Sequence, residues 1–250
     1  MSQLTRFWMR SFFAYFDFCV LRYKAESLFS GQRWVTLLPV CRRWQSIVFS
    51  APLRLDLRVT LTCGTSMREV TVLDIWQTLP IAIGVGSLGH EVVESVIAAL
   101  KHRDRVSEIY FYCSSNNGLK RIVEMMKHPF PILTHLAINT LDQTALVLPD
   151  SLLGGCAPCL RTLQLDNVAF SALPELLLSA TGLVSLVLWD INPSECMSPE
   201  TMADCLSLLT RLEQFHLKFK PGKHLDRTTQ PPHSTSLVLP SLTSLFSSKA

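Results

Sequence analysis

The chain has 250 residues, which is enough for one large domain or for a small module followed by a larger one. Hydrophobic residues make up 48% of it and charged residues 17%, so the composition excludes a disordered chain. The formal net charge of +3 is too small to indicate a nucleic-acid-binding protein. The eight cysteines are mostly scattered singly, which predicts an intracellular protein, cytoplasmic or nuclear. No apolar run reaches about 18 residues, so we expect no membrane anchor.

The N-terminal fifth of the chain is expected to form a small helical module, residues 1–52. An aromatic-rich segment, "FFAYFDFCV" at 12–20, is followed by apolar residues that recur every three or four positions between Trp34 and Phe49. This second pattern ends just before Pro52, which disfavours helix at the preceding residue.

The segment "PIAIGVGSLGHEVVESVI" at 80–97 contains Gly84-x-Gly86-x-x-Gly89 between an apolar run and a helical pattern. This is the order of a dinucleotide-binding fingerprint, so an NAD(P)-binding oxidoreductase is a remote alternative. The acid at the expected spacing, Glu108, precedes the next apolar run, which would put it at the wrong end of that strand to reach a ribose. We therefore predict a strand over 80–83, then a turn, then a helix.

From Val106 onward the pattern apolar-x-x-apolar-x-apolar recurs. Its first residues are 27, 27, 23, 29 and 30 positions apart, close to the lengths of leucine-rich repeats. In such a unit the last two apolar residues point inward from a short strand, and neighbouring units must stack to bury them. The six copies are "VSEIYF", "LTHLAI", "LRTLQL", "LVSLVL", "LEQFHL" and the incomplete "LTSLF".

Helical patterns separate these predicted strands. Apolar stripes predict helices over 90–102, 118–128 and 198–209, the last with Ser198 as N-cap and Pro199 at the first helical position. A shorter helix is expected over 172–180, and the polar, proline-rich stretch 220–235 is expected to be an insertion loop. The repeats end on a strand pattern without a polar capping unit, so the solenoid is expected to be truncated or to need a partner there.

The motifs that could indicate catalysis or metal binding are only weak matches. Cys156 and Cys159 have the spacing of a redox or half-zinc motif, but they precede a strand instead of following one, and no second ligand pair accompanies them. His90-Glu91 lacks the second histidine of a zinc-protease motif, because position 94 is Glu. We therefore expect no catalytic site, no metal and no cofactor.

The N-terminal segment resembles F-box proteins with leucine-rich repeats, especially the large fungal group. The most specific match is "VCRRWQSIVF" at 40–49, followed by Pro52 and the strand-like "RLDLRV" at 54–59, and "FFAYFDFCV" is similar to the family's earlier F-box helix. The family's Leu-Pro opening is missing, and "MSQLTRFWMR" stands in its place. The resemblance covers about residues 11–250.

The resemblance implies an α/β fold: the helical F-box-like module (1–52), then a leucine-rich-repeat solenoid (53–250) with parallel strands inside and helices outside. It also implies a substrate-recognition subunit of a Skp–cullin–F-box ubiquitin ligase, which would bind a Skp-type adaptor and an unidentified protein substrate. The alternative is a repeat protein with a degenerate F-box and no ligase role. The implied adaptor contacts are Phe12, Phe16, Leu37, Val40, Cys41 and Trp44. Positions beside the buried repeat residues are the candidate substrate contacts: Tyr110, His135, Gln164, Val187 and His216.

Overall fold

The computed structural model describes residues 58–62, 73, 77–191, 198–220 and 243–248. Eight strands form one sheet in which every neighbouring pair is parallel and the spatial order follows the chain order. The strands are β1 (Val59–Leu61), β2 (Ile81–Val85), β3 (Val106–Cys113), β4 (His135–Thr140), β6 (Thr162–Asp166), β8 (Ser185–Ile191), β9 (Gln214–Phe219) and β10 (Ser244–Ser248).

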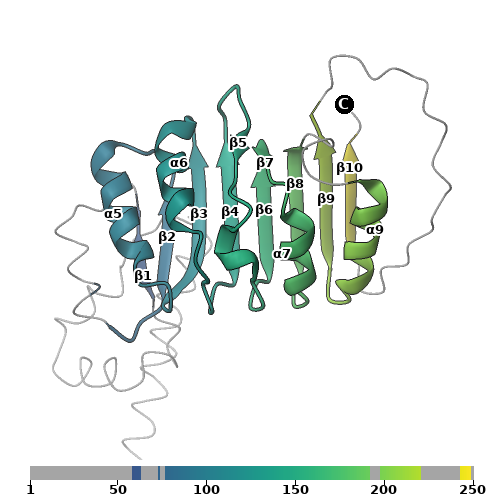
Figure 1. Ribbon diagram of the computed structural model, residues 1–250, viewed down its shortest axis with the longest axis horizontal. Coiled ribbons are helices and arrows are strands. Elements are labelled where there is room, and N and C mark those ends of the chain that lie inside the picture. The colour runs from purple at the N-terminus through teal and green to yellow at the C-terminus, as the bar shows by residue number, and fades with distance from the viewer. Residues whose placement is uncertain (1–57, 63–72, 74–76, 192–197, 221–242, 249–250) are drawn as a thin grey trace, which may run out of the picture.

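Helices lie on one face of this sheet (Figure 1). A strand order that never reverses keeps each right-handed crossover on the same side. Within the described residues no helix covers the opposite face, which we call the open face. The connections contain α5 (His90–Leu100), α6 (Asn116–Met125), the 3₁₀ turn η3 (Leu152–Gly155), α7 (Leu173–Ser179) and α9 (Pro199–Leu208). The predicted α/β fold with a parallel sheet is confirmed at this level.

Side chains cap two of the helices. The Ser198 hydroxyl accepts a hydrogen bond from the backbone N–H of Thr201 and Pro199 occupies the first turn of α9, as predicted from the sequence. Ser115 caps α6 in the same way by accepting from the backbone N–H of Asn117. These caps satisfy backbone donors that have no partner inside the helix.

The core lies between the sheet and the helices. Alternate strand residues point into it, and fully burying one such leucine contributes roughly 1.5–3 kcal/mol. The pairs predicted to face inward are buried in β3, β4, β6 and β8: Ile109 and Phe111, Leu136 and Ile138, Leu163 and Leu165, Leu186 and Leu188. In β9 Phe215 is buried and Leu217 is half-buried. The helix residues Leu119, Ile122, Val123 and Met126 complete the core opposite β3 and β4 as their spacing predicts.

The same backbone contact recurs at the start of successive strands. The N–H of Thr134 donates to the carbonyl of Ser107 at 2.8 Å, and the equivalent bond has the same length at each later strand. The residues joined in this series are Ser107, Thr134, Arg161, Val184, Glu213 and Thr243, which follow the predicted spacing. Consecutive units therefore meet with one geometry.

Two features differ from the sequence-based predictions. Strand β2 continues to Val85, so Gly84 belongs to the strand and not to the turn. Most of the strand-like segment 54–59 lies outside the described residues; of its last two residues, Arg58 precedes β1 and Val59 begins it. A second, two-stranded parallel sheet pairs β5 (Leu146–Val147) with β7 (Val168–Ala169), and no apolar pattern of that length signalled it.

Candidate functional site

Cross-strand register aligns the open-face residues into three rows. In each unit they lie two, four and six positions after the first repeat residue, so the rows run across the strands from β3. The first row is Glu108, His135, Thr162, Ser185 and Gln214, and the second is Tyr110, Ala137, Gln164, Val187 and His216. The third row is Tyr112, Asn139, Asp166 and Trp189.

All five candidate substrate contacts therefore lie on the open face. Tyr110, Gln164, Val187 and His216 occupy one row, and His135 lies in the adjacent row. Each of the five side chains is half-buried. The structure thus brings together residues that are spread over more than a hundred positions, although their role in binding is still a prediction.

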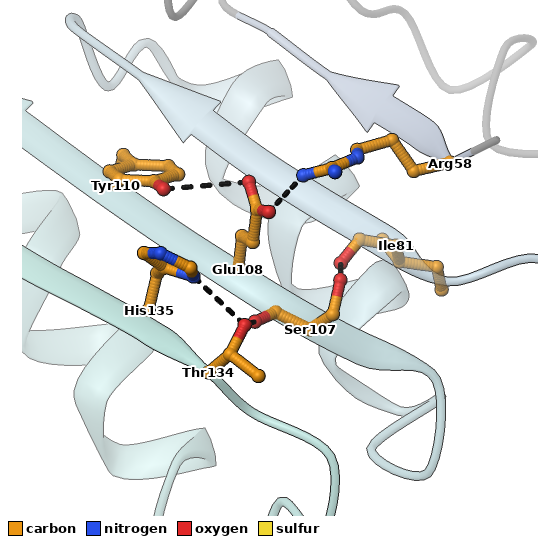
Figure 2. Close-up of polar contacts among 7 residues, drawn as sticks. All are labelled: Arg58, Ile81, Ser107, Glu108, Tyr110, Thr134 and His135. Carbon is orange, nitrogen blue, oxygen red and sulfur yellow. Dashed lines mark hydrogen bonds and ion pairs between the residues drawn. The ribbon is translucent and has the colours of Figure 1, made fainter. Parts of the chain in front are cut away.

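An ion pair and a tyrosine lie together at the β3 end of this face. Figure 2 shows the Arg58 guanidinium against the carboxylate of Glu108, with which it forms an ion pair. The Tyr110 hydroxyl donates to the other carboxylate oxygen at 3.4 Å. The pair reaches across β2, where the in-register residue, Ala82, has a small side chain. Burial first, and then the Glu108 charge, raise the pKa of Tyr110, so the phenol stays protonated.

The Thr134 hydroxyl orients His135 (Figure 2). The Thr134 hydroxyl donates to the Ser107 carbonyl at 3.0 Å and lies 2.8 Å from Nδ1 of His135. Since the hydroxyl has a single hydrogen, Nδ1 donates to it in the neutral ring, and Nε2 carries the lone pair. The His135 ring is tilted by 36° against that of Tyr110, with centroids 6.3 Å apart. Burial lowers the pKa of His135, which favours this neutral form.

Buried polar side chains also join the strands at their carboxyl ends, on the helix side. The Thr140 hydroxyl donates to Asn116 Oδ1 at 2.7 Å, and the Asn116 amide donates to the Thr144 carbonyl at 2.8 Å. The Asn167 amide donates to the Asp142 carbonyl at 2.7 Å, and Lys220 Nζ donates to Asn167 Oδ1 at 3.1 Å. Each of these side chains has a protein partner, so the network stabilises the fold.

The other end of the open face carries acidic and aromatic side chains. Asp190 lies in an irregular part of β8, with φ of 48°, and forms a 2.9 Å ion pair with Lys218. Burial and the nearby Asp190 charge raise the pKa of Asp166 to about 6, although Lys218 opposes this. This cluster was not predicted from the sequence, although the position six residues after the first repeat residue is occupied by Asp166, Trp189 and Lys218 in successive units.

The glycine motif takes the order strand, glycine, helix. Gly84 is in β2, Gly86 follows it, and Gly89 is the N-cap of α5. Glu108 is the third residue of β3, as expected, and it pairs with Arg58. Dinucleotide sites lie where the strand order reverses, and the order of the eight described strands runs in one direction.

The remaining sequence motifs show no chemical centre in the described part of the chain. Cys156 and Cys159 are exposed free thiols in the connection before β6, the position predicted for them. The described residues contain no group of three or more His, Cys, Asp or Glu side chains arranged to hold a metal. Among these residues, too, no helix has the length and apolar character to cross a membrane. The six implied adaptor contacts, from Phe12 to Trp44, lie outside the described residues.

Comparison of the chain with protein families, curated proteins and solved structures finds no significant match. The features that bear on function are the sequence patterns and the geometry of the open face.

Proposed function

We propose that this protein is a protein-interaction subunit that recognises substrates for a Skp–cullin–F-box ubiquitin ligase. In this proposal residues 1–52 bind a Skp-type adaptor, and residues 53–250 form a leucine-rich-repeat solenoid whose open face holds the substrate. The protein then acts by binding its partners and not by catalysis.

The repeated unit is the observation that carries the proposal. Inward-facing residues of successive strands are in register, with Ile109 beside Leu136, Leu136 beside Leu163 and Leu163 beside Leu186. One backbone hydrogen bond recurs at every unit boundary from Ser107 to Thr243. Stacked units with their helices on one side leave rows of side chains on the other, and repeat proteins use such extended surfaces for binding.

The chemistry of the open face also supports a protein ligand. Tyr110, Tyr112 and Trp189 supply aromatic surface, and Trp189 is 37% exposed. Tyrosine, tryptophan and arginine are the residues most enriched where proteins bind one another. Half-buried histidine, glutamine and carboxylate side chains between them supply hydrogen-bonding groups.

The ligase role depends on residues 1–52, so adaptor binding tests it. The full chain and a purified Skp-type adaptor are mixed at micromolar concentration and analysed by size-exclusion chromatography and biolayer interferometry. We expect a complex that Trp44→Ala weakens at least about tenfold, as for a buried aromatic anchor at an interface. The matched control is Trp189→Ala, which removes the same side chain from the open face and leaves adaptor binding unchanged.

The opposite outcome identifies the alternative. If no complex forms, or if Trp44→Ala binds the adaptor as well as the unchanged protein, the ligase role is wrong. The missing Leu-Pro opening of the F-box favours that alternative. The protein would then be a repeat scaffold that binds its partners without ligase attachment.

A further inference from the structure

Two oxygen acceptors lie side by side in the third row of the open face, and no described residue donates to either of them. Asn139 Oδ1 is buried and has no hydrogen-bond partner among the described residues. Its in-register neighbour on β6, Asp166, is half-buried, and its carboxylate forms no hydrogen bond or ion pair within the described part of the chain. Buried acceptors are almost always paired in folded proteins, so Asn139 Oδ1 calls for a donor, which the half-buried Asp166 carboxylate beside it could share.

The charges around Asp166 do not balance. Lys218 forms its ion pair with Asp190, and Lys220 donates to Asn167. With both carboxylates ionised, Lys218 is the one cation among the described residues whose charge acts on Asp166, and it is already paired with Asp190. A ligand with one positive charge complements this end of the face.

Aromatic rings flank the two acceptors in the same row. Tyr112 is in register with Asn139 on one side, and Trp189 is in register with Asp166 on the other. Neighbouring strands are about 4.8 Å apart, so the Tyr112 and Trp189 backbones are separated by roughly 14 Å. The exposed indole of Trp189 offers a face on which a cation can stack.

We propose that the third row binds an arginine side chain of the partner protein, with the guanidinium over Asp166 and Asn139 and against Trp189. Arginine fits better than lysine, because its planar group has five donors and can meet a carboxylate and an amide oxygen while stacking on an aromatic ring. The Asn139 amide can turn toward such a donor, since its terminal torsion is broad. This proposal depends on the proposed use of the open face for protein binding, but it does not require the adaptor.

The test uses the full chain and acetyl-arginine-methylamide as the probe. The Trp189 indole signal in ¹H–¹⁵N NMR spectra is identified by its loss in Trp189→Phe, and it is followed during titration with the probe at pH 7.5. We expect a saturable shift, and affinity at least about fivefold weaker for acetyl-citrulline-methylamide, which has the same shape without the charge.

Two variants carry the same chemical change at different places. Asp166→Asn is expected to weaken binding at least about tenfold, whereas Asp204→Asn, on an exposed position of α9, leaves it unchanged. Binding should also weaken as the pH falls from 7 to 5, because the Asp166 carboxylate takes up a proton in this range, with the charges of Asp190 and Lys218 acting on it in opposite directions. No saturable shift, equal affinity for citrulline, an unchanged Asp166→Asn variant, or binding that does not change with pH would overturn the proposal.

Adaptor binding, measured in parallel, separates the two proposals. If the protein binds the adaptor but not arginine, the arginine site is wrong and the ligase role is supported. If it binds arginine but not the adaptor, the arginine site is supported and the ligase role is wrong.

Discussion

Asp166 should make the folded protein less stable at neutral pH, and replacing it with asparagine should reverse this. Its pKa in the folded chain is about 6, against an ordinary value of 3.8, because burial and the Asp190 charge disfavour the ionised form. The folded state therefore holds a proton that the unfolded state has lost. Stability from this group is fully present below about pH 3.8, and it is lost as the pH rises through about 6.

The size of the effect follows from the shift. A change from 3.8 to about 6 corresponds to about 3 kcal/mol for a fully shielded group. Because Asp166 is only half-buried, solvent screening reduces this to about 1 kcal/mol. Asp166→Asn removes the charge but no hydrogen bond within the described residues, so it should raise the free energy of unfolding by about that amount at pH 7.5.

Urea unfolding followed by far-ultraviolet circular dichroism measures this difference at pH 7.5 and at pH 4. The gain should nearly vanish at pH 4, where Asp166 is already protonated in the folded protein. Asp204→Asn serves as the control with no gain at either pH. A stabilisation of equal size at both pH values, or a loss at pH 7.5, would show that the charge of Asp166 does not strain the fold. If the arginine site is also present, the same variant becomes more stable while it loses binding.

Three further predictions concern the core, the helix contact and the histidine. Leu165→Ala should lower the free energy of unfolding by about 3 kcal/mol, because Leu165 is fully buried, and urea unfolding measures the loss. In the same assay Gly118→Ala should cost about 1–2 kcal/mol, since the new Cβ would lie 2.9 Å from two side-chain carbons. By contrast, Gly89→Ala, with nothing within 4 Å, should cost only about 0.5 kcal/mol, since alanine is the poorer N-cap residue for α5. Glu108→Gln should lower the pKa of His135 further below 6.5 in an NMR titration, because the carboxylate favours the protonated ring; a rise would contradict the geometry of Figure 2.

The repeated apolar spacing made the core predictable. Leu163 and Leu165 are buried because they alternate on a strand whose other face carries Thr162, Gln164 and Asp166. That pattern indicates which residues are buried, and the position of a residue within its repeat indicates which residues share a row. The open-face positions could therefore be predicted without the structure.

The polar contacts could not be predicted in this way. Arg58 and Glu108 are 50 positions apart and meet across β2, so their pairing depends on side-chain reach and not on periodicity. Asn167 adopts a φ of 55° and bonds Lys220, 53 positions away. Asn167 and Lys220 directly follow β6 and β9, where the apolar pattern of the repeat has ended.

The unbroken strand order has a consequence for how the protein folds and fluctuates. Within the described residues, each strand of the main sheet pairs with the strands of that sheet that precede and follow it in sequence, so most contacts between strands join segments about one unit apart. Stability in such a chain is close to a sum of intrinsic and nearest-neighbour terms, and structure can nucleate at one unit and spread outward. Hydrogen exchange should accordingly be slowest in β4 and β6, which have neighbours on both sides and several units beyond them. A ligand bound to the third row would contact strands from β3 to β8 at the same time. Binding should therefore slow amide hydrogen exchange in all of these strands together.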